Sequence, residues 1–390
     1  METFRFPSSA LRLSDVRSRQ IVASPLHTFQ SGISRPISKY SPIRPTRIES
    51  TFGKTCSSTR TTNRTHLLKA FPVKAHAQEQ QGQAKSHLGK NSDAIWRFLR
   101  PFPVIATLVQ FSSFIARLAV ENPNTFQWSN WSMLAKAFMV FTSLSCANVY
   151  ATGVNQIFDI ETDKINKPHL PLCSGEVSME SAWLMVMSFV AISLLAAGTV
   201  NSVPFLALNA LLLLVASSYS IPPLRAKAST FGAPIVNSML DGSVQFLATF
   251  AGGVAALGLP FQMSLPMVFM WTFSSIFFFS MGILKDIPDI EGDRKTNIPT
   301  IATIIGARKT LLIALGMILL IHFGGVLVAL MKPEVFKSNI MIPAHIISII
   351  YEIYQAWKMD RANYEATQSM KAYVSIIAVY LVQILLFPFI

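Results

Sequence analysis

The sequence is poor in charged residues and in cysteine, and each shortage excludes a class of protein. Only 14% of its 390 residues are Asp, Glu, Lys or Arg, whereas 51% are hydrophobic, among them 28 Phe. This composition is too apolar for a soluble domain of this length and indicates an integral membrane protein. Its three cysteines, Cys56, Cys146 and Cys173, have no metal-ligand spacing. They argue against a disulfide framework and against a zinc site.

The first 78 residues lack an apolar stretch and contain few acids. They hold thirteen Lys or Arg against three acids, and so carry +10 of the formal net charge of +13. The basic charge therefore belongs to this leader and does not indicate nucleic-acid binding. A leader rich in Ser, Thr, Arg and Pro without an apolar core is typical of an organellar transit peptide, not of a secretory signal. Abundant hydroxyl residues favour the plastid over the mitochondrion, and a disordered cytosolic tail is the alternative.

We expect three parts along the chain. Residues 1–78 form a disordered plastid transit peptide, cleaved at roughly residues 70–90. Residues 79–101 are a segment before the first membrane span, and residues 102–390 form one transmembrane domain. The domain is expected to lie in a lipid bilayer, and its oligomeric partners remain open.

Apolar runs recur from residue 102 to the end of the chain. Each is near the roughly 20 residues that a helix needs to cross the hydrocarbon layer. Because strands of a membrane barrel would alternate apolar and polar residues, these unbroken runs predict helices. We predict an all-α integral membrane protein, a bundle of nine transmembrane helices. The predicted spans are residues 102–120, 133–154, 182–200, 203–219, 234–257, 264–284, 310–330, 339–357 and 372–390.

Lys and Arg are unequally distributed between the two sides that nine crossings create. Fourteen lie in loops on the N-terminal side, and only Lys136, Lys332 and Lys337 lie on the other side. The positive-inside rule then places the N-terminal side of the domain inside. In a plastid membrane this side would face the stroma.

Two clusters of oxygen-bearing side chains follow apolar runs on this same side. They are Asn155, Asp159 and Asp163, and Asp286, Asp289 and Asp293. Helical spacing would place the members of each cluster on one face, where like charges repel unless a cation lies between them. Mg²⁺ is the natural candidate, because it prefers a few hard oxygen ligands and keeps positions open for phosphate oxygens. The clusters predict metal-assisted handling of a diphosphate, with both motifs facing one central cavity.

Basic residues beside the clusters are candidates to bind diphosphate oxygens. They are Lys164, Lys167, Arg225, Lys227, Lys285 and Arg294. The alternative is that they only anchor helix ends at the membrane surface. Glu161 and Glu291 fall off the acidic faces by helical spacing, and we interpret them as residues that flank the ligands.

Both motifs resemble those of the UbiA superfamily of intramembrane aromatic prenyltransferases, and especially its plant plastid branch of homogentisate, flavonoid and coumarin prenyltransferases. The resemblance runs from about Trp96 to the C-terminus and includes residues 164–168 and 219–227. It implies transfer of a prenyl group from an allylic diphosphate to an aromatic carbon, with release of diphosphate. It also implies that each cluster holds one Mg²⁺, which would stabilise the leaving diphosphate.

Polar residues inside the spans are costly in lipid and are expected to face the bundle interior. Asp241 is a candidate to orient the phenolic acceptor or to accept its proton, and a hydrogen bond between helices is the alternative. Asn148 and Tyr150 precede the first cluster on the same predicted helix and are candidates to line the acceptor pocket. His322 and His345 are interpreted as structural.

The first span departs from the plant branch, whose members usually begin it with Arg-Pro-His-Thr. Here Phe102 and Pro103 follow Arg100 and Pro101. If the missing His helps to place a carboxylated acceptor, its absence favours a flatter, less anionic phenol of specialised metabolism. We therefore predict transfer from dimethylallyl diphosphate to a hydroxycoumarin such as umbelliferone, or to a flavonoid.

Three alternatives to this function remain open. The alternative within the family is homogentisate prenylation for tocopherol or plastoquinone synthesis. Outside the family, a cation-coupled transporter would also carry carboxylates in its spans, but near the middle of the bilayer. A non-catalytic membrane scaffold would not need two separated metal-type clusters.

Overall fold

The computed structural model describes residues 92–125, 127 and 129–390. The predicted transit peptide, its cleavage site and most of the segment before the first span therefore lie outside the described residues. The described residues form helices joined by loops and contain no strand. The prediction of an all-α protein is confirmed.

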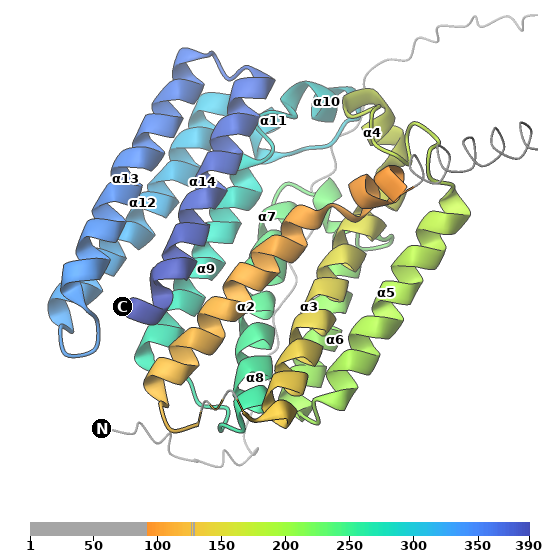
Figure 1. Cartoon of the computed structure of the whole chain (residues 1–390). Helices are drawn as coiled ribbons and strands as arrows, with labels where there is room; N and C mark the ends of the chain where they lie inside the picture. The colour runs from red at the N-terminus through yellow and green to blue at the C-terminus, as the bar shows by residue number, and fades with distance from the viewer. Residues whose placement is uncertain (1–91, 126, 128) are drawn as a thin grey trace, which may run out of the picture. The chain divides into compact units, whose positions relative to one another are not determined.

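The nine predicted spans correspond to nine long helical segments within the described residues. They are α2 (Pro101–Glu121), α3 (Trp131–Phe158), α5 (Met179–Thr199), α6 (Val203–Ser220), α7 to α8 (Gly232–Leu257), α9 (Leu265–Leu284), α12 (Ala307–Met331), α13 (Ser338–Arg361) and α14 (Ala366–Leu386). Shorter helices join them at the ends of the bundle (Figure 1). These are α4 (Ile160–Asn166), η1 (Ala226–Ala228), α10 (Ile290–Lys295), α11 (Ile301–Ile305) and η3 (Phe387–Phe389).

Eight of these segments are long and apolar enough to cross a membrane, and α13 is the exception. Two polar residues of α13 are buried against α12. His345 and His322 approach through their Nδ1 atoms at 2.8 Å, and His322 Nε2 lies 3.1 Å from Glu352 Oε1. These contacts fit the structural role expected for the histidines. The crossing of the membrane by α13 stays a prediction.

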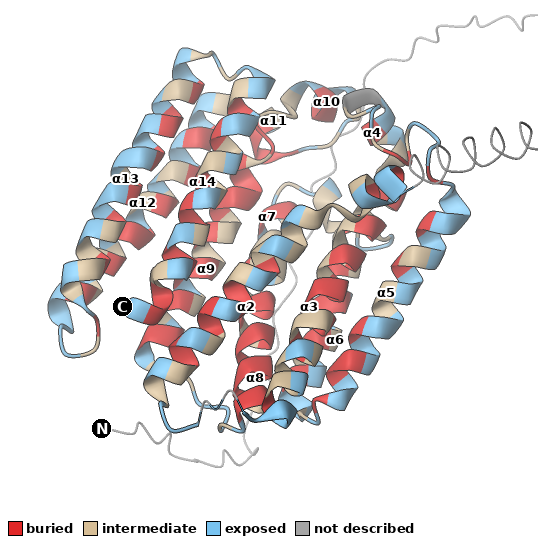
Figure 2. Ribbon diagram, viewed as in Figure 1, coloured by how far each residue is buried: buried red, intermediate tan, exposed pale blue. Residues whose placement is uncertain are grey.

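The outward faces of the helices are apolar and exposed, as expected for a protein surrounded by lipid. Figure 2 shows exposed positions recurring along α5 and α13. Leu195 on α5 is 72% exposed and Leu320 on α12 is 70% exposed. A soluble monomer rarely exposes so many large apolar side chains together. The chain is a multi-pass membrane protein.

Two apolar cores lie side by side in the bundle, and α8 contributes to both. One is formed mainly by α3, α5 and α6, and the other mainly by α9, α12 and α14. The helix pair α2 and α14 lies together (Figure 1). Ser113 of α2 donates a hydrogen bond to the carbonyl of Ile384, and Arg117 donates to the carbonyl of Ile390. The buried Arg117 is thereby satisfied inside the bundle.

Small residues let neighbouring helices approach closely. A Cβ atom at Gly252 of α8 would lie 2.3 Å from the side chain of Val140 on α3. One at Gly242, just before α8, would lie 2.8 Å from the carbonyl oxygen of Ser274 on α9. In lipid, where apolar burial gives helices little net attraction, such close packing is a main source of association. Substitution of either glycine would force these helices apart.

The two acidic clusters differ from the regular helices that their spacing suggested. The first helix ends at Phe158, Asp159 leaves the helical conformation, and α4 follows. In the second cluster α9 ends at Leu284, and α10 begins only at Ile290. Pro288 lies in this gap, and its missing N–H and its ring disfavour a continuous helix. Each cluster therefore wraps around a helix break at one end of the bundle.

Candidate functional site

The two predicted clusters come from different halves of the chain and meet at one end of the bundle. Helices α4 and α10, which carry parts of them, contact each other there (Figure 1). Lys167 lies between the clusters, with its Nζ atom 3.9 Å from Asp163 Oδ1 and 4.0 Å from Asp289 Oδ2. One ammonium group thus links a carboxylate of the first motif to a carboxylate of the second.

The first motif is completed by the loop after α6. Lys227, in η1, contacts the carboxylate of Asp159 and donates to Asn155 Oδ1 over 3.3 Å. Ser220 Oγ, at the end of α6, donates to the same Asn155 oxygen over 2.9 Å. Burial lowers the pKa of the Lys227 ammonium, while Asp159 favours its charged form. The loop that shares the family resemblance is therefore part of the site.

The second motif buries negative charge. Asp286 and Asp293 are both less than a tenth exposed. Burial raises the pKa of Asp286 to about 7, and repulsion from Asp293 and Asp289 adds to the effect although Lys285 opposes it. Burial, with repulsion from Asp289, raises the pKa of Asp293 to about 6. A divalent cation would favour the ionised form of these groups.

The remaining predicted basic residues differ in position. Lys285 donates to the hydroxyl of Tyr219, and its Nζ lies 4.7 Å from the centre of that ring. Arg225 is half-buried at the start of η1. Lys164 and Arg294 are exposed, and Lys164 pairs with Glu161 over 3.3 Å. The structure therefore brings Lys167 and Lys227 into contact with the carboxylates and leaves Lys164 and Arg294 facing outward.

One basic residue was not predicted as part of the site. Arg100, immediately before α2, is half-buried and close enough to Asp163 and Asp159 to be attracted by both. The feature of the sequence that could have indicated Arg100 is its position at the start of the first span, before Pro101. Glu161 and Glu291 are exposed, in agreement with their helical phase.

A cavity of about 410 Å³ extends from the first motif into the bundle. Its polar lining includes Arg100, Asn148, Asn155, Tyr219, Asp241 and Tyr373. Two of the three predicted acceptor-pocket residues, Asn148 and Asp241, are thus in its wall. Tyr150 is not among the lining residues, and its hydroxyl lies 2.5 Å from Ser217 Oγ on α6. Phe102 and Pro103 also line the cavity, so the departure in the first span falls at this site.

Asp241 lies in a π-helical stretch, η2 (Ser238–Val244), between α7 and α8. Ser238 Oγ donates to the carbonyl of Ser275 over 2.6 Å, and the hydroxyls of Ser243 and Ser275 are 2.6 Å apart. These bonds fix η2 against α9. Within the described residues, no hydrogen bond joins Asp241 to another helix, which was the alternative to a role in the cavity. Single π-helical turns recur at functional sites.

The donor atoms fit Mg²⁺, although the protein alone does not surround it. In the part of the chain that the structure describes, no three His, Cys, Asp or Glu side chains are close enough to hold a metal ion together. Mg²⁺ is usually bound through one or two carboxylates, with substrate phosphates and water as its other ligands. The predicted ligands are all carboxylate or amide oxygens, and each motif presents them at one end of the bundle. They are suited to a metal whose coordination a diphosphate completes.

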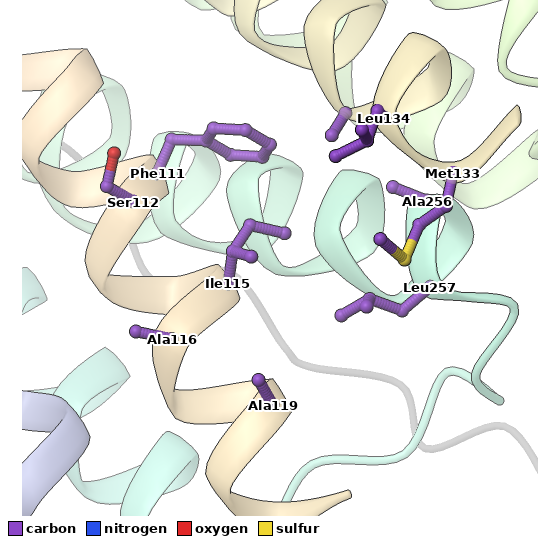
Figure 3. A pocket seen from close by; sticks show the side chains of 10 residues that line it. Phe111, Ser112, Ile115, Ala116, Ala119, Met133, Leu134, Ala256 and Leu257 are labelled. Carbon is purple, nitrogen blue, oxygen red and sulfur yellow. The ribbon is translucent and has the colours of Figure 1, made fainter. Parts of the chain in front are cut away.

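A second cavity, of about 570 Å³, is larger but offers no chemistry. Figure 3 shows its wall of Phe111 and Ile115 from α2, Met133 and Leu134 from α3, and Leu257 from α8. None of its lining residues is titratable. The smaller cavity, which Asn155 of the first motif lines, is therefore the candidate site.

Known proteins resemble this chain in sequence. The model of the UbiA prenyltransferase family matches residues 110–377. The chloroplastic homogentisate solanesyltransferase of Arabidopsis thaliana is 36% identical over 314 residues, which is 80% of each chain. The chloroplastic 2-acyl-4-prenylphloroglucinol 6-prenyltransferase of Humulus lupulus is 36% identical over 299 residues, or 76% of this chain and 72% of the relative.

A solved structure has the same fold. It is a UbiA homolog from Archaeoglobus fulgidus bound to GPP and Mg²⁺, with a TM-score of 0.54 and 20% identity. The match covers 75% of this chain and 99% of that one.

Proposed function

Because this chain belongs to the UbiA prenyltransferase family and is an aromatic prenyltransferase of plastid membranes, we propose that it moves a dimethylallyl group from dimethylallyl diphosphate to a neutral plant phenolic. The acceptor we propose is a hydroxycoumarin or a flavonoid, and the active face is the stromal one. Membership of this family removes the transporter and the scaffold from the alternatives.

The observation that carries the proposal is the position of Lys167. Its ammonium lies within 4.0 Å of a carboxylate from each motif. The motifs therefore share one mouth, and the cavity that Asn155 lines begins beside it. A diphosphate held at this mouth would place its allylic chain in the cavity.

The metal ligands we propose are those of the two motifs. They are Asn155, Asp159 and Asp163 for one Mg²⁺, and Asp286, Asp289 and Asp293 for a second, which would draw these last three carboxylates closer together than they lie here. Mg²⁺ bound there would neutralise the diphosphate as it leaves.

The basic residues would hold the diphosphate in place. Lys167, Lys227 and Arg100 lie beside the carboxylates and would bind its oxygens. When the allylic C–O bond breaks, its electron pair leaves with the diphosphate. The apolar wall around Phe102 and Phe278 would keep water from the allylic cation until the ring attacks.

The acceptor supplies the electrons for the new carbon–carbon bond. Asp241 would accept a hydrogen bond from its phenol and so orient the ring. The attacked carbon then loses its proton, which the departing diphosphate or water would take. Phe102 stands where members of the plant branch usually have His, and this supports an acceptor without a carboxylate. Homogentisate prenylation remains the second candidate, supported by the likeness to the Arabidopsis enzyme.

The test is a microsomal assay of the full chain with Mg²⁺. Dimethylallyl and longer diphosphates are offered with umbelliferone, flavonoids, isoflavonoids and homogentisate, and products are identified by mass and ring position. We expect a prenylated coumarin or flavonoid, lost in Asp159→Asn and in Asp286→Asn. The matched controls Glu161→Gln and Glu291→Gln remove exposed carboxylates from the same motifs. Turnover of homogentisate alone would overturn the proposed acceptor.

A further inference from the structure

Two glutamines in the wall of the reaction cavity have amide atoms without partners. Gln110 on α2 is 7% exposed and Gln245 at the start of α8 is 4% exposed, and both line the cavity. Within the described residues, the amide nitrogen of Gln110 forms no hydrogen bond. The same holds for both the nitrogen and the oxygen of the Gln245 amide.

Other buried amides of the bundle have at least one partner, although the amide oxygens of Gln156 and Asn209 are also unpaired. Gln156 donates to the carbonyl of Phe98 over 2.8 Å, Asn209 donates to Ser193 Oγ over 2.9 Å, and Gln383 donates to Ser348 Oγ over 2.9 Å. Gln245 is the single residue in the described part of the chain for which both side-chain polar atoms are buried and unpaired. A buried polar group without a partner is costly, and native proteins rarely retain one without a reason.

The glutamines lie away from the diphosphate end of the cavity. Gln110 follows Arg100 by ten residues on α2, which is about 15 Å along a helix. Gln245 follows Asp241 by four residues, and both line the cavity. A group bound by these amides would therefore lie beyond the phenol that Asp241 is proposed to orient. The lining of the cavity also includes the apolar residues Ile377 and Leu381.

The charges of the lining residues restrict what the amides can bind. Arg100 is the only Lys or Arg among the described residues that line the cavity, and it lies at the mouth beside Asp163 and Asp159. Lys285 does not line the cavity, and its ammonium is already bonded to Tyr219 and attracted by Asp241. A carboxylate at the deep end would therefore lack a free opposite charge, which is strongly unfavourable. A neutral carbonyl or hydroxyl group, in contrast, matches an amide that can both donate and accept.

We propose that Gln110 and Gln245 form the acceptor-recognition site, which hydrogen-bonds a neutral carbonyl group on the part of the aromatic acceptor farthest from the diphosphate. This inference rests on the proposed function and narrows it. It assigns the acceptor to phenols that carry a lactone or ketone, and it makes the two amides the determinants of that choice.

The test compares acceptors with and without the carbonyl. Umbelliferone is paired with 7-hydroxychroman, and a flavanone is paired with the corresponding flavan, using whichever pair the wild type prenylates. We expect the wild type to favour the carbonyl-bearing member by about 10-fold in kcat/KM, the effect of roughly one hydrogen bond left unmade. Gln245→Met and Gln110→Met should reduce this ratio toward one, while the KM for dimethylallyl diphosphate stays within about twofold of the wild type.

Stability measurements separate recognition from a structural role. Met is similar to Gln in length and has no amide to leave unpaired. In the absence of acceptor, the thermal midpoints of Gln110→Met and Gln245→Met should therefore equal or exceed that of the wild type. The matched control Gln383→Met removes a buried amide that is bonded to Ser348 outside the cavity. It should lower the midpoint and leave the acceptor ratio unchanged.

The outcomes distinguish this inference from the proposed function. If the wild type prenylates a neutral phenol and the Gln110 and Gln245 variants keep its preference for the carbonyl, the recognition site is wrong and the proposed function stands. A lower thermal midpoint in those variants, with an unchanged ratio, would likewise make the glutamines structural. Turnover of homogentisate alone, or of no aromatic acceptor, would overturn both.

Discussion

Asp159 and Asp289 adopt nearly the same backbone conformation in two separate motifs, with φ −102° and ψ 3° at Asp159 and φ −102° and ψ 4° at Asp289. Each precedes a short helix, and its carbonyl accepts the N–H of the residue four positions later. These bonds are 2.7 Å to Asp163 and 2.9 Å to Asp293. The motifs are therefore built alike, although the second contains a proline-interrupted turn before its Asp289.

This equivalence predicts equal effects of substitution at Asp163 and Asp293. Each of Asp163→Asn and Asp293→Asn should lower kcat by about 100-fold, because each removes charge from one side of the diphosphate site. Steady-state assays of the purified variants measure this. The exposed carboxylates Glu161 and Glu291 provide the controls, and their Gln variants should stay within about threefold of the wild type. A large loss at one motif only would contradict the equivalence.

Lys167 should matter more than its neighbour Lys164. Lys167→Met removes an ammonium that contacts both motifs, and we expect kcat/KM for the allylic diphosphate to fall by about 30-fold. Lys164→Met removes an exposed lysine that pairs with Glu161, and it should have little effect. Initial rates at varied donor concentration compare the two. Equal losses would show that both lysines act through the general charge of the surface.

The requirement for Mg²⁺ should increase as the pH falls. The pKa of Asp286 is raised to about 7 and that of Asp293 to about 6, so both carboxylates are mainly ionised at pH 8. At pH 6 protons occupy most of the Asp286 carboxylates and compete with the metal. The Mg²⁺ concentration for half-maximal activity should therefore be about tenfold higher at pH 6 than at pH 8. The measurement is enzyme activity as a function of Mg²⁺ concentration at pH 6 and at pH 8. The same half-maximal Mg²⁺ concentration at both pH values would contradict the prediction.

Tyr150 and Tyr373 should respond differently to loss of their hydroxyls. Tyr150→Phe removes the bond to Ser217 between α3 and α6, which we expect to cost about 1 kcal/mol of stability. Because Tyr150 is outside the cavity, the kcat and KM of the Tyr150→Phe variant should hardly differ from those of the wild type. Tyr373 lines the cavity, so Tyr373→Phe should alter the KM for the acceptor instead. Thermal unfolding in detergent and acceptor titrations separate the two effects.

Phe102 should influence which acceptor is used. Phe102→His introduces at the cavity wall the imidazole that members of the plant branch usually carry, and we expect turnover of homogentisate relative to a neutral phenol to rise about tenfold. Phe102→Leu keeps the site apolar and serves as the control. A ratio that changes equally in both variants would mean that only the size of the side chain matters.

The spans and both motifs were predictable because their signals are local. A run of about 20 apolar residues has few alternatives to a membrane helix, and two carboxylate clusters at helix ends are conspicuous in such a composition. The breaks at Asp159 and before Ile290 were not predicted, because helical spacing assumes a continuous helix. The contacts of Lys167 and Lys227 depend on tertiary packing, which cannot be predicted from the spacing of residues along the sequence.

The lining of the cavity was predicted only in part. Asn148 is seven residues before Asn155, which returns to the same helix face, whereas Tyr150 is five residues before it and about 140° away. Helical phase alone would have separated the two. Gln110 and Gln245 were overlooked because uncharged amides in a span are less unusual than charges. Their unpaired atoms become apparent only when the packed neighbours are known.

With the proposed acceptor and metal sites, the π-helical stretch η2 would give the bundle a way to change its acceptor without altering its metal chemistry. A π-helical turn accommodates one more residue than an α-helical turn. Deletion of one residue from η2 would restore the α-helical ladder and rotate the segment that precedes it by about 100° relative to α8. Asp241 and Gln245 would then no longer point the same way, while both acidic motifs would keep their sequence. Insertions and deletions of single residues in this span are therefore a route by which related enzymes can diverge in the molecules they modify.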